Sequence, residues 1–345
     1  MVERRELVIT RVGAQGDGIA EVDGAPVYVP YTLAGERVEA EIHGERGKLI
    51  DVIEASAHRV APPCRHFGSC GGCALQHMDA ALYLAWKRQL VADAFAARGL
   101  DAAVSPTVPC AGKRRRATFA ALPVKSGVVM GFHRAQSHDI VDLSECIVVH
   151  PAIVSAMPRL RTLVAPLLAR KGETRVTVTW TNSGLDIAVE GHGQRLTPEL
   201  RADVARNAAQ GSIARVSVGG DPVVENVAPV IAFGRAEVVP PPGGFLQAVG
   251  EAEAELAERI AGAAGKARSV ADLFCGIGAF SFRLATRARV FAADADKAGL
   301  EALAAAARKA TGLKPIETCL RDLYRQPLSA NELNTYEAVV FDPPR

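Results

Sequence analysis

The sequence predicts a multidomain α/β protein that begins with a small β-barrel, continues through a central α+β region and ends in a parallel, doubly wound sheet. The chain has 345 residues, which is too long for one ordinary hydrophobic core. Residues 6–56 read as short strands, whereas helices and strands alternate after residue 244. The first pattern is typical of a barrel and the second of a parallel sheet covered by helices.

The N-terminal strands are separated by turn residues. Asp23-Gly24 lies between the apolar runs 18–22 and 25–29, which is a strong hairpin signal. Four or five short strands in about fifty residues favour a small barrel, because closure hides the sheet edges. An ordinary β-domain without a ligand is the alternative interpretation of the same pattern.

The composition is that of a globular protein, with 49% apolar and 23% charged residues. No run approaches the ~18 consecutive apolar residues of a membrane-spanning helix. The N-terminus, Met1-Val-Glu-Arg-Arg-Glu6, lacks the apolar core of a signal peptide, so a cytoplasmic protein is expected. The net charge is only +2, and nucleic-acid binding would therefore depend on local patches.

Three cysteines cluster as Cys64-x5-Cys70-Gly-Gly-Cys73. The chain has seven cysteines and no export signal, so metal ligands or catalytic thiols are expected rather than disulfides. The glycines allow backbone N–H groups to face the sulfurs, and zinc and iron–sulfur centres both use such loops. Both centres usually have four ligands; Cys146 is the predicted fourth ligand and Cys110 its competitor. The spacing leaves the choice between zinc and iron–sulfur open.

A predicted strand, Arg268–Phe274, runs into the glycine-rich turn Gly276-Ile-Gly278 and then into a predicted helix at 279–288. Small residues there let a ligand approach the crevice where open α/β sheets bind it. The acidic residue near the end of the next strand, Asp294 or Asp296, would accept hydrogen bonds from ribose hydroxyls. No third glycine follows, which favours a nucleoside such as S-adenosylmethionine over a dinucleotide.

Two further segments carry less information by themselves. Asp342-Pro-Pro-Arg345 follows the predicted strand 338–341 and would point a carboxylate into the same crevice. The basic cluster Lys113-Arg114-Arg115-Arg116 is either a solvated surface or a patch that contacts phosphates. Its place in a chain with a small barrel and a cysteine loop favours phosphate contact by Arg114, Arg115 and Arg116.

These segments, in this order, resemble the RNA uracil-C5 methyltransferases of bacteria that carry an iron–sulfur cluster and make 5-methyluridine in ribosomal and transfer RNA. The resemblance covers essentially the whole chain. Its most specific parts are Cys64-x5-Cys-Gly-Gly-Cys-Ala-Leu-Gln-His77, Phe245-Leu-Gln247, Asp272-Leu-Phe-Cys-Gly-Ile-Gly278 and Asp342-Pro-Pro-Arg345.

The resemblance implies three domains: a TRAM domain at 1–56, which is an OB-like RNA-binding barrel; a central iron–sulfur and RNA-binding domain at 57–240; and a class I, Rossmann-like methyltransferase domain at 241–345, with 79–99 packed against it in space. It implies a 4Fe–4S cluster held by Cys64, Cys70, Cys73 and Cys146. It implies an S-adenosylmethionine site lined by Gln247, Phe274, Asp294, Asp322 and Asp342. The implied partner is RNA, ribosomal rather than transfer RNA, and the complete protein is expected to be a monomer.

The chain departs from the family at two points. Ala279 stands where the family has asparagine, and the family's Ser-Cys-Asn-Pro nucleophile motif would follow Arg345. That cysteine matters because C5 of uracil is a weak nucleophile until a thiolate adds to C6, after which a base removes the C5 proton. Neither Cys275 nor Cys319 matches its position. We therefore expect a C-terminally truncated, inactive chain without catalytic residues; a non-catalytic RNA-binding iron–sulfur protein is the alternative.

Overall fold

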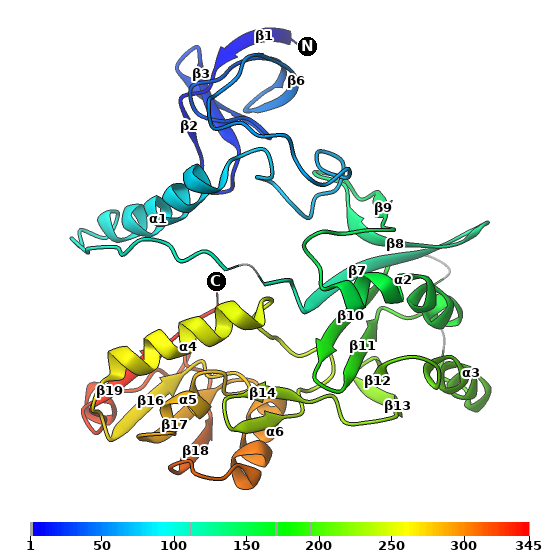
Figure 1. Ribbon diagram of the computed structural model, residues 1–345, viewed down its shortest axis with the longest axis vertical. Coiled ribbons are helices and arrows are strands. Elements are labelled where there is room, and N and C mark those ends of the chain that lie inside the picture. The colour runs from blue at the N-terminus through cyan, green and yellow to red at the C-terminus, as the bar shows by residue number, and fades with distance from the viewer. Residues whose placement is uncertain (1–2, 111, 170–171, 194, 345) are drawn as a thin grey trace. The chain divides into compact units, whose positions relative to one another are not determined.

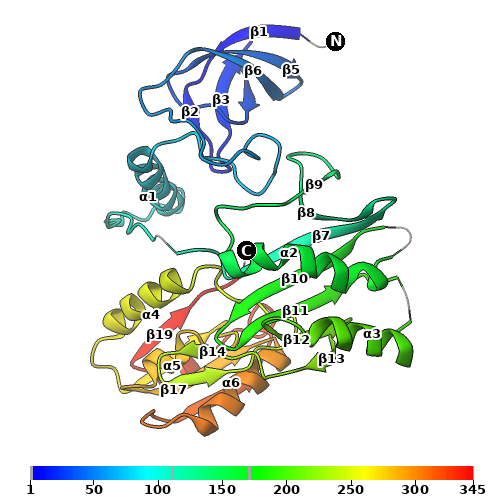
Figure 2. The same cartoon turned by 45° about the vertical axis from the view of Figure 1, so that its right-hand side comes forward.

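The computed structural model describes residues 3–110, 112–169, 172–193 and 195–344 (Figures 1 and 2). The chain forms two compact units. The first consists of residues 1–110 with 132–141, and the second of residues 111–131 with 142–345. This division does not test the domain limits at 56 and 240, which stay a prediction, as does the packing of 79–99 against the methyltransferase domain.

The first unit begins with a six-stranded sheet in the order β1-β5-β6-β4-β3-β2. The strands are β1 (Glu3–Val8), β2 (Arg11–Val12), β3 (Gly18–Val22), β4 (Ala25–Val29), β5 (Arg37–His43) and β6 (Arg46–Glu54). Alternate apolar side chains, including those of Ile9, Val29 and Val38, form one buried core. Asp23 and Gly24 both have positive φ angles, 52° and 81°, as the predicted tight hairpin between β3 and β4 requires.

A cysteine-bearing loop and a helix follow the sheet. Helix α1 (Ala80–Ala96) begins after Asp79, whose carboxylate accepts a hydrogen bond from the backbone N–H of Leu82 at 2.7 Å. The predicted N-cap is therefore confirmed. None of the residues of α1 is buried.

The second unit contains a seven-stranded sheet in the order β13-β12-β11-β10-β7-β8-β9. Residues 132–141, from the end of β8 into β9, belong to the first unit. The strands of the sheet are β7 (Arg116–Val124), β8 (Gly127–His133), β9 (Ile140–Asp142), β10 (Thr174–Thr181), β11 (Gly184–Glu190), β12 (Ile213–Val218) and β13 (Asp221–Glu225). Helix α2 (Pro151–Val164), the short 3-10 helix η1 (Ala165–Leu167) and helix α3 (Pro198–Ala208) accompany it. Both α helices pack on the sheet through an apolar stripe with helical spacing.

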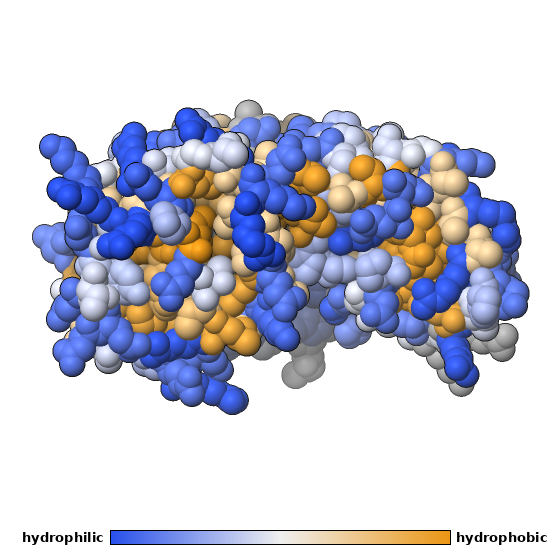
Figure 3. Space-filling view, turned by 90° about the horizontal axis from the view of Figure 1, so that it is seen from below, coloured by the Kyte–Doolittle hydropathy of each residue, from blue (hydrophilic) through white to orange (hydrophobic). Residues whose placement is uncertain are grey.

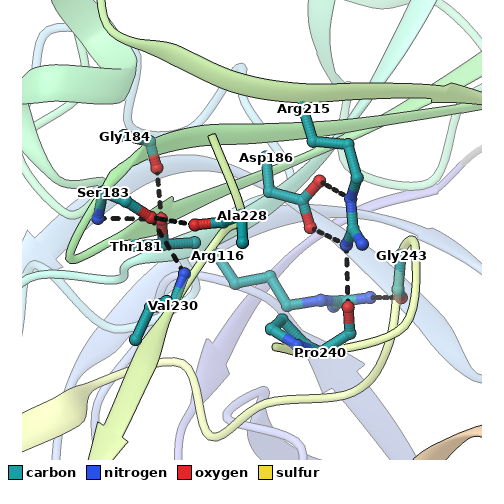
Figure 4. A network of polar contacts seen from close by, with 10 residues as sticks. All are labelled: Arg116, Thr181, Ser183, Gly184, Asp186, Arg215, Ala228, Val230, Pro240 and Gly243. Carbon is teal, nitrogen blue, oxygen red and sulfur yellow. Dashed lines mark hydrogen bonds and ion pairs between the residues drawn. The ribbon is translucent and has the colours of Figure 1, made fainter. Parts of the chain in front are cut away.

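The proline- and glycine-rich segment 239–244 is fastened to this central sheet. Arg215 on β12 makes a buried, two-pronged ion pair with Asp186 on β11, with N–O distances of 2.9 and 2.7 Å (Figure 4). The same guanidinium donates to the carbonyl of Pro240 at 2.8 Å, and Arg116 donates to that of Gly243 at 3.1 Å. The hairpin of β14 (Ile231–Phe233) and β15 (Ala236–Val238) precedes this segment in the chain. The contacts of Arg215 and Arg116 hold the segment on the central sheet, and the chain then continues into its C-terminal part.

The C-terminal part of the second unit is a parallel four-stranded sheet in the order β18-β17-β16-β19. Its elements are α4 (Gly250–Ala264), β16 (Ser269–Leu273), α5 (Ser281–Leu284), β17 (Arg289–Asp294), α6 (Lys297–Lys309), β18 (Ile316–Leu320), α7 (Ala330–Leu333) and β19 (Ala338–Phe341). The predicted doubly wound sheet is confirmed. The strand order reverses between β16 and β19, which creates a ligand crevice at the carboxyl ends of these strands.

Two details of this sheet differ from the sequence prediction. β18 was not predicted, because its five residues show no regular alternation of apolar and polar side chains and none of them is buried. The helix expected at 279–288 has only four residues in regular α-helical form, α5, and is continued by turns.

The described helices include none that is long and apolar enough to cross a membrane. The face seen from below carries several separate apolar areas among hydrophilic residues (Figure 3).

Candidate functional site

The glycine-rich turn after β16 has an unusual backbone. Gly276 and Gly278 have φ angles of 53° and 90°, and Phe274 has a φ of 62°, a left-handed conformation that is strained for an aromatic residue. The N–H of Phe274 donates to the carbonyl of Ala293 on the neighbouring strand at 2.9 Å. A Cβ atom at Gly278 would come within 2.9 Å of the Leu303 side chain, so only glycine allows this close packing.

Asp294, the last residue of β17, fixes the turn. Its Oδ2 accepts a hydrogen bond from the N–H of Gly276, and its Oδ1 accepts one from the N–H of Asp296, both at 2.8 Å. Asp296 in turn caps α6 by accepting from the N–H of Ala298 at 3.1 Å. Each Asp294 oxygen has further acceptor capacity, which a ligand with two adjacent hydroxyl groups could use.

A cavity of about 90 Å³ opens beside this turn. Three of the residues predicted to bind the cofactor, Gln247, Phe274 and Asp342, line it, and Asp296 lines it as well. Asp294 is not among the lining residues, but its carboxylate is hydrogen-bonded to Gly276, which is one of them. The structure thus gathers most of the predicted residues around one crevice, although their role in binding stays a prediction.

Asp322 lies just after β18 and accepts hydrogen bonds from the N–H groups of Tyr324 and Arg325, both at 3.1 Å. The ring of Tyr324 lies 5.3 Å from that of Phe274, and its hydroxyl donates to the carbonyl of Pro344 at 2.6 Å. Asp322 therefore organises a loop that reaches the same end of the sheet. Arg345, the last residue of the predicted motif, lies outside the described residues.

Two ionisable groups beneath the turn are buried. Burial raises the pKa of the Asp272 carboxyl to about 7, although Ser281 donates a hydrogen bond to it. Burial, together with the charges of Asp272 and Asp294, also raises the pKa of the Cys275 thiol far above its ordinary value. A thiol in this environment stays protonated, which makes Cys275 unsuitable as a nucleophile.

The cysteine loop of the first unit has a different environment. Cys70 is buried and Cys64 and Cys73 are half-buried. The N–H of Gly72 points at the Cys70 sulfur, 3.4 Å away. A Cβ atom at Gly71 would lie 3.0 Å from the carbonyl oxygen of His133, which explains why a residue without a side chain is needed there.

The fourth predicted ligand, Cys146, is half-buried and belongs to the second unit, whereas its competitor Cys110 is exposed and belongs to the first. In the described parts of the chain, no three Cys, His, Asp or Glu side chains are gathered closely enough to hold a single metal ion. The predicted ligand set therefore stays a prediction.

The arginines of the basic cluster 113–116 are less exposed than a patch that contacts phosphates would be. The Arg115 guanidinium pairs with Glu253 of α4 at 2.8 Å and donates to the carbonyl of Gln247 at 3.3 Å. Arg116 is half-buried and donates to Gly243. Two of the three arginines expected to contact phosphate are thus used inside the protein, and of the three only Arg114 is exposed.

Comparison with known proteins identifies the family. Residues 2–46 match the TRAM domain. An uncharacterized RNA methyltransferase of Brucella suis is 45% identical over 341 residues, which cover 99% of this chain and 82% of that protein. One of Caulobacter vibrioides is 42% identical, covering 99% of this chain and 84% of that protein. The chain belongs to the RNA methyltransferases.

One further relative of this RNA methyltransferase and one solved structure with a similar fold have more specific names. The 23S rRNA (uracil(1939)-C(5))-methyltransferase of Halomonas elongata is 35% identical, over 99% of this chain and 76% of that protein. The crystal structure of the Pyrococcus abyssi tRNA (uracil-54, C5)-methyltransferase in complex with S-adenosyl-L-homocysteine has the same fold, with a TM-score of 0.73 and 18% identity, covering 99% of this chain and 83% of that chain.

Sequence reasoning missed one residue of this RNA methyltransferase that faces the crevice and assigned no role to another. Glu253 lines the cavity and is buried, although nothing in the sequence distinguishes it from Glu251 or Glu255 in the same helix. Phe245 also lines the cavity and is 71% exposed, which is unusual for an aromatic side chain. An exposed aromatic residue beside a cavity can stack on a base.

Proposed function

We propose that this RNA methyltransferase transfers a methyl group from S-adenosylmethionine to C5 of uracil in RNA, in the cytoplasm and as a monomer. The observation that carries the cofactor assignment is the crevice between β16 and β19, where Asp294, Gln247 and Phe274 surround a glycine turn without a third glycine. A pyrophosphate would need more backbone N–H groups directed at it, whereas a nucleoside needs a carboxylate for its ribose.

The bound cofactor would supply a methyl group on a positively charged sulfur. The chain's own residues would bind and orient it. Asp294 would accept hydrogen bonds from the ribose hydroxyls, Asp322 and Tyr324 would border the base, and Gln247 and Asp342 would lie towards the reacting end. Phe274 would provide an apolar wall, and its fixed backbone would keep that wall in place.

Ribosomal RNA is the proposed substrate. The support is the 35% identity to a 23S rRNA uracil-C5 methyltransferase, whereas the tRNA enzyme is similar in fold at 18% identity. The TRAM domain and the exposed Arg114 would provide contacts to the RNA backbone.

The uracil C5 reaction requires a thiolate that adds to C6. Cys275 is buried with a raised pKa, and Cys319 packs against the small core of Ala293, Leu323 and Leu328 and is not among the residues that line the cavity. We therefore propose that neither Cys275 nor Cys319 is the nucleophile of this reaction.

Cys64, Cys70, Cys73 and Cys146 are proposed to hold a 4Fe–4S cluster. The chemistry of the loop fits such a group, because one cysteine sulfur already accepts an N–H from Gly72 and the glycine pair lets the backbone approach closely. The cluster would supply a structural link among these four residues.

The test combines cofactor binding with product analysis. S-adenosylhomocysteine is titrated into residues 1–345 by calorimetry, and binding is expected to weaken roughly 10- to 100-fold in Asp294→Ala, since hydrogen bonds to a charged group are lost. Ribosomal and transfer RNA from a deletion strain are then incubated with the protein and S-adenosylmethionine, and 5-methyluridine is measured.

We expect 5-methyluridine in ribosomal RNA and none in transfer RNA. The absence of binding to S-adenosylhomocysteine would contradict the cofactor assignment. Loss of methylation in Cys275→Ala or Cys319→Ala would contradict the exclusion of these thiols as the nucleophile. Binding of RNA without any methylation would favour the non-catalytic iron–sulfur protein.

A further inference from the structure

A hollow of about 460 Å³ lies in the central part of the second unit, between helix α2 and the starts of β11 and β12. It has no lining residue in common with the cavity at the glycine turn, among the residues that the structure describes. Its volume is within the range of roughly 300–1,000 Å³ that ligand pockets have. Helical spacing places three small side chains and one cation of α2 on the face that borders it: Ala152, Ser155, Ala156 and Arg159.

The opposite wall of the hollow is held by hydrogen bonds. The N–H of Leu185 donates to the carbonyl of Ser212 at 2.7 Å, and both residues line the hollow. A Cβ atom at Gly184 would come within 2.6 Å of the same carbonyl oxygen, so only glycine allows the two strands to approach this closely. The hydroxyl of Thr181 closes the hairpin by donating to the carbonyl of Gly184 at 2.6 Å (Figure 4). A wall fixed in this way needs little rearrangement to accept a ligand.

Trp180, near the end of β10, forms a third side of the hollow. Its ring stacks on that of His150, with centroids 5.3 Å apart and an angle of 14° between the planes. Its backbone N–H donates to the carbonyl of Arg115 at 2.6 Å, which fixes the start of the side chain. The stack with His150 covers one face of the indole and leaves the other face outside the stack. A flat ligand can stack on an indole that is held in this way.

Arg159 brings a positive charge to the hollow. Its guanidinium lies against the backbone at Gly211, where any Cβ atom would collide with it, so glycine makes room for this arginine. Arg159 is half-buried and makes no hydrogen bond or ion pair with a described residue. The described residues that line the hollow include no acidic side chain. The guanidinium is therefore available to an anionic ligand group.

An indole face and a guanidinium without a partner suit a nucleotide. The base can stack on Trp180 and the phosphate can bind Arg159. The exposed hydroxyl groups of Ser155 and Ser212 also border the hollow and can bond to a ribose. Proteins recognise RNA mainly in single strands, because their unstacked bases can lie on aromatic side chains. A base inside a duplex is covered on both faces by its neighbours.

We propose that this hollow binds one nucleotide of a single-stranded stretch of the RNA substrate, away from the uracil that is methylated. This inference rests on the proposed function, because that function makes RNA the ligand. Trp180 stacks on the base, and Arg159 binds the phosphate. A further cavity, of about 570 Å³, shares Trp180 with the hollow and Phe233 with the cavity at the glycine turn, so it borders both. A strand whose target uracil enters the crevice can therefore place another nucleotide in the hollow, and that nucleotide helps to select the RNA.

The test uses the fluorescence of Trp180. The chain has two tryptophans, so Trp86→Phe leaves Trp180 as the only indole. Single-stranded oligouridylate, the duplex of oligouridylate with oligoadenylate, and inorganic phosphate are each added to this protein. The titrations are repeated after Arg159→Gln. Arg201→Gln is the matched control, because Arg201 is an exposed arginine of α3 and its replacement changes the net charge equally.

We expect the single strand to quench the fluorescence, because a stacked base lies against the indole, and we expect the duplex and inorganic phosphate to leave it unchanged. Arg159→Gln should weaken binding of the single strand about tenfold, as the loss of a charged hydrogen bond predicts. It should also reduce the slope of log affinity against log salt by about 0.7, the value for one phosphate contact of a single strand. Arg201→Gln should change neither.

Equal quenching by the duplex would overturn the inference, because a paired base cannot stack on the indole. Unchanged binding in Arg159→Gln, or an equal loss in Arg201→Gln, would overturn it as well, since the phosphate would then respond only to the overall charge. S-adenosylhomocysteine binding should be the same in all these variants, which shows that they are folded. Normal S-adenosylhomocysteine binding without any quenching by RNA would therefore refute the hollow as a nucleotide site and leave the proposed cofactor intact.

Discussion

The loop Cys70-Gly-Gly-Cys73 and the turn Cys275-Gly-Ile-Gly278 are built from nearly the same residues and have opposite chemistry. In the loop, the N–H of Gly72 points at a cysteine sulfur. In the turn, the N–H of Gly276 points at the carboxylate of Asp294, and Cys275 is buried with a raised pKa. The comparison shows that the role of a cysteine beside glycines depends on which atoms accept hydrogen bonds from the neighbouring N–H groups.

The largest expected effect is on metal content. Anaerobically purified protein should contain about four irons per chain. Cys70→Ser and Cys146→Ser should each abolish iron binding, because a cluster needs all its thiolates, whereas Cys110→Ser and Cys275→Ala should leave it intact. Iron analysis and visible absorption provide the measurement. Stoichiometric zinc without iron in the unaltered protein would show that the loop holds a different centre.

The second effect is a pH dependence of the free energy of unfolding, which we expect from the turn after β16 and not from the cysteine loop. The pKa of Asp272 is raised to about 7 in the folded protein. A folded-state pKa above the unfolded value means that the folded chain keeps a proton that the unfolded chain loses. The free energy of unfolding should therefore fall as the pH rises from about 4 to about 7 and level off above that, by up to about 4 kcal/mol from this group.

Asp272→Asn should remove this pH dependence. Urea denaturation of both proteins at pH 5 and pH 8 measures it, and the difference between the two proteins cancels the other titrating groups. An identical pH dependence in the two proteins would mean that Asp272 is not the group responsible.

A smaller effect is expected from the two glycines of the turn. Gly278→Ala should lower the free energy of unfolding by about 2–3 kcal/mol, because the new Cβ would collide with Leu303 and the φ of 90° is unfavourable. At Gly276 no atom lies within 4 Å of such a Cβ, so Gly276→Ala should cost only about 1 kcal/mol, from its φ of 53°. Equal losses in the two variants would contradict the packing argument.

The smallest effect concerns the thiol of the turn. Cys275→Ala should lower the free energy of unfolding by about 1 kcal/mol, the cost of removing one small buried group. It should leave the rate of 5-methyluridine formation unchanged. A complete loss of methyl transfer with normal stability would instead identify Cys275 as the nucleophile.

Much of the fold could be predicted from local sequence. The Asp23-Gly24 turn, the Asp79 cap and the glycine turn after β16 are each determined by residues within a few positions of one another. Such signals can be recognised without knowledge of the tertiary structure, because the turn conformation and the helix cap depend on short-range geometry.

The rest depends on contacts between distant residues. Arg115 and Glu253 are 138 positions apart, so a sequence shows a basic cluster and an acidic helix but not their pairing. β18 escaped prediction for a related reason, since Ile316-Glu-Thr-Cys-Leu320 is a strand only because β17 binds it. The same limit applies to Asp342, whose place in the cavity wall depends on the pairing of β19 with β16.

The left-handed backbone of Phe274 has a consequence for protein engineering. At a φ of 62° glycine would relieve strain of about 1–2 kcal/mol, but it would also remove a ring that lines the cavity and packs against the core of Ala293, Leu323 and Leu328. The loss of a packed aromatic side chain costs more than the strain that is relieved. A screen for heat resistance and a screen for ligand binding would therefore both retain phenylalanine at this position.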